Sequence, residues 1–132
     1  KLYFDVKNYI NQNNLNDYID MPGYLNEQEI KKLYSETFIY VFPSLDEGFG
    51  IPLIESMKSE VPIICSDIEI FKEIGKDSVS YFRAGNHNDL YEKLNILIND
   101  GDLRKKLVKL GKKNVKRFNT NNFIKEFEKI YN

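Results

Sequence analysis

The sequence has very few of the side chains that most often bind metals or cross-link a fold. Cysteine and histidine occur once each among 132 residues, so no disulfide can close within the chain, and the candidate carboxylates form no clustered ligand set. Cys65 ends a short apolar run, which is typical of a buried strand residue and not of a nucleophile. His87 lies in a polar loop and receives no role. We therefore expect neither a metal site nor thiol chemistry.

An excess of charge of either sign is also missing, as is a long apolar run. Lys and Arg number 19 and Asp and Glu number 20, which gives a formal net charge of −1. This balance gives no electrostatic reason to expect nucleic acid as the main partner. No stretch has the length of a membrane span or the pattern of a signal peptide. Together with the single cysteine, this favours a cytoplasmic location.

The most informative stretch covers residues 41–57, VFPSLDEGFGIPLIESM. The apolar residues 38–42 predict a central parallel strand that is covered on both faces, and Pro43 ends it. Residues 47–50, EGFG, then form a polar turn, and Pro52 suits the first turn of a helix. The pattern therefore predicts a strand, a tight turn and a helix.

This turn has the chemistry of a site for a phosphorylated, hydroxyl-rich ligand. Gly48 and Gly50 allow positive φ and close approach of the backbone to a ligand. The first amides of the following helix lie at the positive end of its dipole, which favours phosphate. Glu47 and Glu55, with seven residues between them, can accept hydrogen bonds from sugar hydroxyls. Amides and glutamates in this arrangement suit a nucleoside diphosphate sugar.

The stretch resembles the E-x7-E signature of the retaining glycosyltransferases of family four, the group 1 glycosyltransferases, whose GT-B fold has two Rossmann-like domains. The matching residues are Pro43, Ser44, Glu47, Gly48, Phe49, Gly50, Pro52, Leu53, Glu55, Met57, Pro62 and Ile63. The likeness covers nearly the whole chain but only one domain of such an enzyme. Glu60 departs from it, because the family has a glycine there; a left-handed backbone would cost a side chain about 1 kcal/mol.

The resemblance implies a role for each candidate residue. Glu55 would accept hydrogen bonds from the ribose hydroxyls and Glu47 from the transferred sugar, and these two are the candidate catalytic residues. The candidates for donor binding are Ser44, Gly48, Phe49, Gly50, Ile51, Leu53, Gly23 and Tyr24. The amides of Phe49, Gly50, Ile51 and Leu53 would meet sugar and phosphate oxygens. The nucleotide sugar is the substrate, transfer retains the anomeric configuration, and no cofactor or metal is implied.

Two of these assignments are less specific. Gly23 and Tyr24 would contact the nucleotide base, or they form only an ordinary turn between a strand and a helix, and both interpretations stay open. Glu73 matches an acidic position of the family, but glutamates on helices are usually just solvated.

Hydrophobic periodicity predicts the order of elements along the chain. Strands are expected at residues 18–21, 38–42, 61–65 and 79–82, and helices at residues 2–13, 26–36, from Pro52, at 70–74 and from Asn88 onward. Ser66-Asp67 is expected to cap the helix at 70–74, and Gly75 to close it. The order predicts an α/β fold: a Rossmann-like, mostly parallel sheet with flanking helices, the C-terminal half of a GT-B fold. Ligands of such sheets lie at the carboxyl ends of the strands.

Three apolar stripes mark the helical part, residues 88–132. They are Leu90, Leu94, Leu97 and Ile98; Leu103, Leu107 and Leu110; and Phe123, Phe127, Ile130 and Tyr131, with Gly101 and then Asn119-Thr120 between them. The second helix is basic, with Arg104, Lys105, Lys106, Lys109, Lys112, Lys113, Lys116 and Arg117. A solvated face is the commoner cause of such a pattern, and peripheral contact with anionic lipid at the inner face of the membrane is the alternative.

The length allows one core but not two Rossmann domains, so residues 1–132 are expected to form a single nucleotide-sugar-binding domain. The chain begins at Lys1, and the resemblance implies a C-terminal piece whose acceptor domain and diphosphate-neutralising basic pair lie upstream. The isolated chain is then expected to be inactive and to bind donor weakly. Its sheet would pair differently, expose an edge or associate with a partner chain.

Two other functions stay open on the sequence. A GT-B epimerase or phosphorylase shares the architecture, although the E-G-F-G-x-P-x-x-E spacing is less expected there. A non-catalytic α/β binding module, such as a response-regulator-like domain, shows the same alternation of elements. Such a module is expected to carry an acidic cluster at the end of its first strand, which is not seen here. The sequence specifies neither the sugar, the base nor the acceptor.

Overall fold

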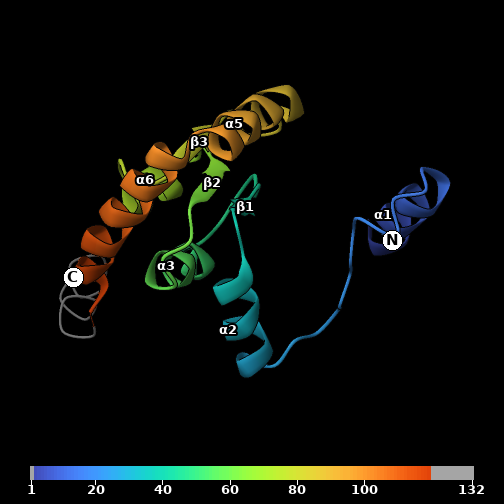
Figure 1. Cartoon of the computed structure of the whole chain (residues 1–132), viewed down its shortest axis with the longest axis horizontal. Helices are drawn as coiled ribbons and strands as arrows, with labels where there is room; N and C mark the ends of the chain where they lie inside the picture. Colours follow the sequence, from blue (N-terminus) through green and yellow to red (C-terminus); the bar gives the residue numbers. More distant parts are fainter. Residues whose placement is uncertain (1, 120–132) are drawn as a thin grey trace. The chain divides into compact units, whose positions relative to one another are not determined.

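The computed structural model describes residues 2–119, which form two compact units. The first unit extends to Ile30 and the second begins at Lys31, so the boundary lies inside helix α2 (Glu27–Glu36). Figure 1 shows the helices and strands of both. The expectation of one domain over residues 1–132 stays a prediction.

The first unit begins with helix α1 (Leu2–Gln12), which confirms the helix expected at residues 2–13. Ile10 is buried, whereas Phe4 and Tyr9 are largely exposed. The start of α2 is also as predicted: Asn26 Oδ1 accepts hydrogen bonds from the amides of Gln28 and Glu29, both at 3.0 Å. The Glu29 carboxylate accepts from the Asn26 amide at 2.7 Å, which completes a capping box.

The strand expected at residues 18–21 is wrong, because this segment forms no strand. The amides of Tyr18 and Ile19 both donate to the Leu15 carbonyl at 3.0 Å, which makes a turn. A strand is stable only where a neighbouring strand accepts its hydrogen bonds, and the sequence pattern does not show whether such a neighbour is present.

The second unit has a three-stranded parallel sheet in the order β1-β2-β3 (Figure 1). Its strands are β1 (Tyr40–Phe42), β2 (Ile63–Ser66) and β3 (Ser80–Phe82). In the register, Ile64 is opposite Val41 on one side and Ser80 on the other. All four residues of β2 are buried, as expected of a central parallel strand. The predicted α/β class and parallel pairing are confirmed.

The apolar run at residues 38–42 was expected to be a strand covered on both faces, and this is wrong in two respects. The strand contains only its last three residues, which are half-buried, and it is an edge of the described sheet because it pairs with β2 alone. Phe38 lies before the strand and is 58% exposed. The Arg104 guanidinium lies 4.5 Å from the centre of its ring, so a cation covers the aromatic face in place of a core.

Helices cover both faces of the sheet. Helices α3 (Ile51–Lys58) and α4 (Glu69–Gly75) pack on one face, and α5 (His87–Asn99) and the first half of α6 (Gly101–Asn114) on the other. The second half of α6 packs against α3 and α4. The larger core cluster consists of Leu53, Ile54, Met57, Ile63, Cys65, Phe71, Ile74 and Val79. Cys65 is fully buried as predicted, and burial raises the pKa of its thiol to about 12. The smaller cluster is Ile64, Phe82, Leu97 and Leu107.

The caps of α4 differ from the prediction. Ser66 belongs to β2, and the N-cap of α4 is Ile68, without a side-chain hydrogen bond. Asp67 Oδ1 instead accepts a hydrogen bond from the Ala84 amide at 2.9 Å, after the neighbouring strand β3. At the other end, Gly75 is the last helical residue, and Lys76 adopts the positive φ of 48°. The sequence could not show that Asp67 caps a neighbouring loop.

The end of α6 holds the end of α4 in place. Asn114 Nδ2 donates to the carbonyl of Ile74 at 2.8 Å and to that of Gly75 at 3.2 Å. Asn114 Oδ1 accepts from Arg117 Nε at 2.8 Å. Carbonyls at the end of a helix lack partners within it. Asn114 and Arg117 supply partners for the Ile74 carbonyl, and Ser78 shares that of Gly75 with Asn114.

The helical part largely agrees with the prediction. Asp100, not Gly101, separates α5 from α6, and its side chain accepts a hydrogen bond from the Leu103 amide. Ile98 was expected in the buried stripe of α5 but is 50% exposed, because Leu97 takes the buried position. The short helix η1 (Val115–Phe118) follows α6. The third predicted stripe, Phe123, Phe127, Ile130 and Tyr131, and Thr120 lie outside the described residues.

Glu60 could either cap the helix differently from the family's glycine or tolerate a left-handed backbone, and its φ of 59° shows the second. The Glu60 amide donates a hydrogen bond to the Met57 carbonyl, and the Val61 amide donates one to the Ser56 carbonyl, each at 3.2 Å. This is the hydrogen-bond pattern of a Schellman motif. The Glu60 carboxylate lies 2.7 Å from the ammonium of Lys112. The ion pair is exposed and worth at most about 1 kcal/mol, so it offsets the similar backbone cost of a non-glycine residue here.

Candidate functional site

The signature stretch forms the predicted strand, turn and helix. β1 ends at Phe42, residues 43–50 form the loop, and α3 begins at Ile51, with Pro52 in its first turn. Gly50 is the N-cap of α3, with φ 71° and ψ 41°. The loop lies at the carboxyl end of a parallel strand, where ligands of such sheets bind. The positive φ expected for Gly50 is confirmed, whereas the one expected for Gly48 is wrong.

Gly50 is required by its surroundings as well as by its backbone. A Cβ atom built on it would lie 3.0 Å from Phe71 Cε1 and 3.5 Å from Ile74 Cδ1. The Phe71 ring in turn packs against Phe42, with 4.6 Å between ring centres. The backbone at Gly50 therefore packs directly against the core. This contact fixes the position of the loop relative to the sheet.

Glu47 is held by a neighbour in the loop. Its side chain is half-buried, and its Oε1 atom accepts a hydrogen bond of 2.8 Å from Ser44 Oγ. Ser44, expected to bind the donor, thus also orients the carboxylate that is expected to hold the transferred sugar. A hydroxyl of the sugar substrate can still donate a hydrogen bond to the other carboxylate oxygen of Glu47.

Glu55 is on the exposed side of α3, while Leu53, Ile54, Ser56 and Met57 are buried. The backbone amides of α3 are also in part engaged, because the Leu53 amide donates to the Gly50 carbonyl at 2.9 Å. A phosphate oxygen at Leu53 would have to share this amide. The first amides of a helix have no acceptor within it, which leaves Gly50 and Ile51 better placed for such a contact.

Two tyrosines that the sequence did not single out as site residues lie near the first turn of α3. The rings of Tyr34 and Tyr40 pack against each other, with ring centres 5.7 Å apart. Tyr34 Oη also donates a long hydrogen bond of 3.5 Å to the Pro52 carbonyl in the first turn of α3. The pair connects α2 and β1 to the helix that carries Glu55.

Burial and nearby negative charge both act on the phenols of Tyr40 and Tyr34. Burial raises the pKa of Tyr40 most, followed by Tyr34 and by the negative charges of Glu55 and Glu47. Burial and then the charge of Glu55 raise the pKa of Tyr34 as well. Both phenols therefore stay protonated at neutral pH. The charges of Glu47 and Glu55 therefore both act on the Tyr40 phenol, and that of Glu55 also acts on Tyr34.

Tyr40 could have been found from the sequence only in part. Tyr40 and Phe42 alternate along the strand and share a face, with ring centres 5.9 Å apart, which reads as core packing. What distinguishes Tyr40 is the contact of its ring with that of Tyr34, a residue on the preceding helix. That contact depends on how α2 packs against β1, which periodicity does not specify.

Gly23 and Tyr24 belong to the first unit and are described there by themselves. Gly23 has a φ of 73°, and nothing lies within 4 Å of the position a Cβ atom would take. Tyr24 is 94% exposed. The positive φ confirms a glycine turn at Gly23. Contact of these residues with a nucleotide base stays a prediction, as does the alternative of an ordinary turn.

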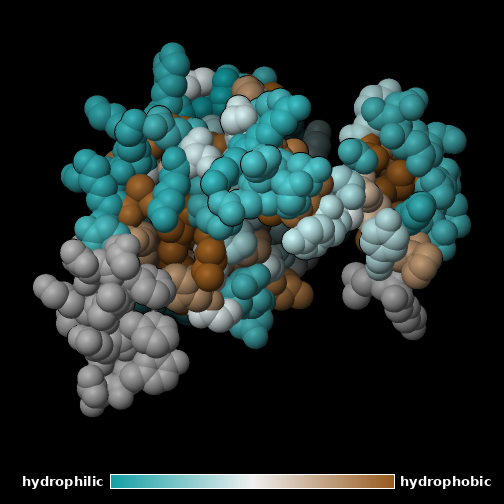
Figure 2. All heavy atoms as spheres, turned by 90° about the horizontal axis from the view of Figure 1, so that it is seen from below, coloured by the Kyte–Doolittle hydropathy of each residue, from teal (hydrophilic) through white to brown (hydrophobic). Residues whose placement is uncertain are grey.

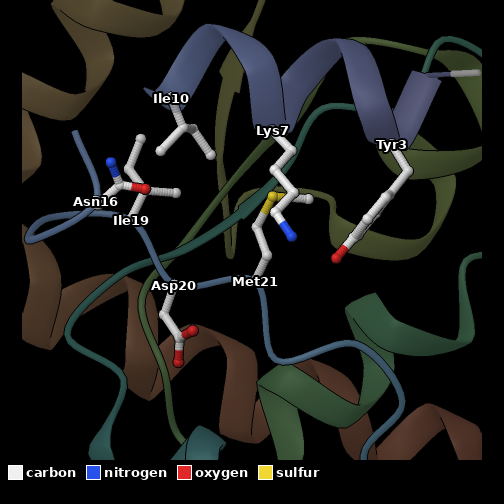
Figure 3. A pocket seen from close by; sticks show the side chains of 7 residues that line it. All are labelled: Tyr3, Lys7, Ile10, Asn16, Ile19, Asp20 and Met21. Carbon is white, nitrogen blue, oxygen red and sulfur yellow. The ribbon is translucent and has the colours of Figure 1, made fainter. Parts of the chain in front are cut away.

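The first unit also contains an open cavity of about 260 Å³ between α1 and the segment after it (Figure 3). It is lined by Tyr3, Lys7, Ile10, Asn16, Ile19, Asp20 and Met21. None of the expected donor-binding residues lines it. Apolar side chains also reach the surface of the described units among hydrophilic ones (Figure 2). The apolar residues that line this cavity therefore do not by themselves identify it as a ligand site.

Metal ligands do not gather anywhere in residues 2–119, where no three His, Cys, Asp or Glu side chains are placed to hold an ion. The expectation that transfer needs no bound metal stays a prediction. In the same part of the chain, no helix is long and apolar enough to cross a membrane.

The parallel sheet and the loop after β1 define an open α/β domain of the kind that binds ligands at the carboxyl edge of its sheet. A family model described as "Glycosyl transferases group 1" matches residues 3–114. The chain belongs to this family of glycosyltransferases, and its fold is that of a GT-B domain.

Individual proteins agree with this family. The chain is 33% identical to an uncharacterized glycosyltransferase of Methanocaldococcus jannaschii, over 99% of this chain and 38% of that protein. It is 46% identical to the O-antigen chain mannosyltransferase of Salmonella typhimurium, over 47% of this chain and 18% of that protein. The solved C-terminal domain of a group 1 glycosyl transferase from Francisella tularensis superposes with a TM-score of 0.76 and 27% identity, covering 87% of this chain and 60% of that one.

Proposed function

We propose that this chain is the donor-binding part of a longer retaining hexosyltransferase, which moves a sugar from a nucleoside diphosphate to an acceptor. The observation that supports this most is the loop at the carboxyl end of β1, where Ser44 holds the Glu47 carboxylate and α3 presents Glu55 on its exposed side. The chain spans 38% of the length of the archaeal relative, which agrees with a role as one part of a larger enzyme.

The residues have distinct tasks in this proposal. Glu55 binds the ribose hydroxyls, and Glu47, oriented by Ser44, binds the hydroxyls of the transferred sugar. The amides at Gly50 and Ile51 bind diphosphate oxygens. Their interaction strengthens as negative charge develops on the departing diphosphate, and an interaction that strengthens in the transition state lowers the barrier. No step requires a metal or a cofactor.

The proposal separates what this chain does from what it leaves to the rest of the enzyme. The acceptor site and a basic pair against the diphosphate are supplied by another part of the protein. Because one relative is named a mannosyltransferase, a guanosine diphosphate sugar, GDP-mannose, is the first donor to test. A GT-B epimerase or phosphorylase remains the second candidate, since it shares the architecture.

Stereochemistry and fragment activity test this proposal together. The enzyme that contains this chain and its acceptor domain is incubated with a nucleotide sugar, and proton NMR follows the anomeric signal of the product. We expect transfer with the anomeric configuration of the donor retained, and no turnover by the 132-residue chain alone. An inverted product, or turnover by the isolated chain, would contradict the proposal. Phosphorolysis without transfer to a hydroxyl would favour the second candidate.

A further inference from the structure

Positive charge is concentrated in one short segment of the chain. Residues 101–118 contain eight Lys or Arg and a single acidic residue, Asp102, which gives a formal charge of +7. The whole chain has 19 basic and 20 acidic residues, so the remainder has 11 basic and 19 acidic residues and a formal charge of −8. Positive and negative charge are therefore strongly separated along the chain, although the total is only −1. Such a separation is typical of a basic segment that contacts an anionic partner.

The basic residues of α6 share one side of the helix. Lys105, Lys106, Lys109, Lys112 and Lys113 are exposed, and at about 100° per residue they fall within an arc of about 120°. These five and Lys116, which is exposed in η1, are the lysine face. The opposite side of α6 is packed, with Leu107 in the core and Gly111 against Met57. The face is about 12 Å long over α6, and α6 is the orange helix of Figure 1.

Few carboxylates neutralise this face within the described part of the chain. Lys105 lies 4.0 Å from Asp102, and Lys112 lies 2.7 Å from Glu60. The lysines that form no ion pair with a described carboxylate are Lys106, Lys109, Lys113 and Lys116. The pairs that exist are exposed and weak, so most of the charge is available to a partner.

The two arginines of the segment do not contribute to the face. Arg104 covers the ring of Phe38 and donates hydrogen bonds to the carbonyls of Leu97 and Ile98. Arg117 donates to the Asn114 side chain at 2.8 Å. Only ammonium groups remain on the exposed side. Lysine is a compact, hydrated point charge on a flexible stem, whereas arginine is the residue suited to bidentate phosphate recognition.

We propose that the lysine face docks on the surface of a lipid bilayer that contains anionic headgroups. Hydrated point charges along one convex helix side fit the diffuse field of such a surface, and each lysine near it strengthens binding about fivefold. The arc has no aromatic side chain on which a base could stack and no arginine to read a base edge, which disfavours nucleic acid. Since the apolar side of α6 is buried in the fold, attachment is purely electrostatic and peripheral.

Vesicle binding of the full 132-residue chain tests this proposal. Vesicles of neutral phosphatidylcholine are compared with vesicles that contain about 30% phosphatidylglycerol, at about 0.05 M and about 0.5 M salt. The face variant combines Lys106→Gln, Lys109→Gln and Lys113→Gln. The control combines Lys58→Gln, Lys72→Gln and Lys76→Gln, three exposed lysines outside α6, and leaves the same net charge. Circular dichroism establishes that both variants are folded.

We expect the chain to bind anionic vesicles at low salt, to leave them at high salt and to ignore neutral vesicles. The face variant should bind about 100-fold more weakly, and the control variant within about threefold of the original chain. Equal loss in both variants, or binding to neutral vesicles, would overturn the proposal, as would absence of binding to anionic vesicles. So would tighter, face-dependent binding to a duplex of DNA or RNA, measured by fluorescence polarisation in the same buffer.

Discussion

Gly50→Ala is expected to lower the free energy of unfolding by about 2–4 kcal/mol. A side chain at a φ of 71° costs roughly 1–2 kcal/mol. The new Cβ atom would lie 3.0 Å from Phe71 Cε1, and Phe71 is fully buried, so the ring cannot move away freely. Overpacking of a core adds about 1–3 kcal/mol.

Gly48 provides a matched control for Gly50 in the same loop. Its φ is not positive, and nothing lies within 4 Å of the position of its Cβ atom. Gly48→Ala should therefore change stability by less than about 1 kcal/mol, in the stabilising direction if the loop backbone suits alanine. Urea unfolding followed by circular dichroism compares the two. Equal losses would mean that the contact between the start of α3 and the core does not fix this loop.

Glu55→Gln and Glu47→Gln should each reduce kcat/KM for the donor by about 10–100-fold in an enzyme that contains this chain with its acceptor domain. A hydrogen bond to a charged group contributes about 1.5–3 kcal/mol, and glutamine keeps the shape but loses the charge. If Glu55 binds ribose in ground and transition state alike, its loss should raise KM. If Glu47 holds the sugar as it reacts, its loss should lower kcat.

Glu36→Gln is the control for these two changes, because Glu36 is an exposed residue at the end of α2 that pairs only with Lys32 among the described residues. It should leave kcat/KM within about threefold of the original enzyme. Should all three variants retain transfer, the assignment of Glu47 and Glu55 to the donor would be wrong. Should all three lose it alike, the effect would be one of net charge and not of the site.

The sequence predicted the parts of the fold that depend on local pattern. The strands at β2 and β3, the capping box at Asn26 and the helix after Pro52 follow from apolar periodicity and from residues with strong local preferences. Each of these features is determined within about one helical turn of chain, which is the range over which sequence patterns carry information.

The features that sequence reasoning missed depend on distant contacts. Residues 18–21 have the composition of a strand, but the amides of Tyr18 and Ile19 donate hydrogen bonds to the Leu15 carbonyl. Asp67 was expected to cap α4 but accepts a hydrogen bond from the Ala84 amide. Gly48 and Gly50 look alike in the sequence, but only Gly50 has a positive φ and lies against Phe71. In the candidate site, the sequence pointed to Glu47 and Glu55, but it gave no sign that Tyr34 and Tyr40 pack together near the first turn of α3.

The most direct measurement is an NMR titration of the ¹⁵N-labelled 132-residue chain with UDP, GDP, ADP and their sugar conjugates, GDP-mannose first. We predict that one nucleotide family produces saturable shifts in the amides of residues 43–58, with weak affinity because the rest of the enzyme is absent, and that Glu55→Ala diminishes them. Saturable shifts that leave residues 43–58 unmoved, or that persist unchanged in Glu55→Ala, would contradict the claim that this loop and helix bind the sugar donor.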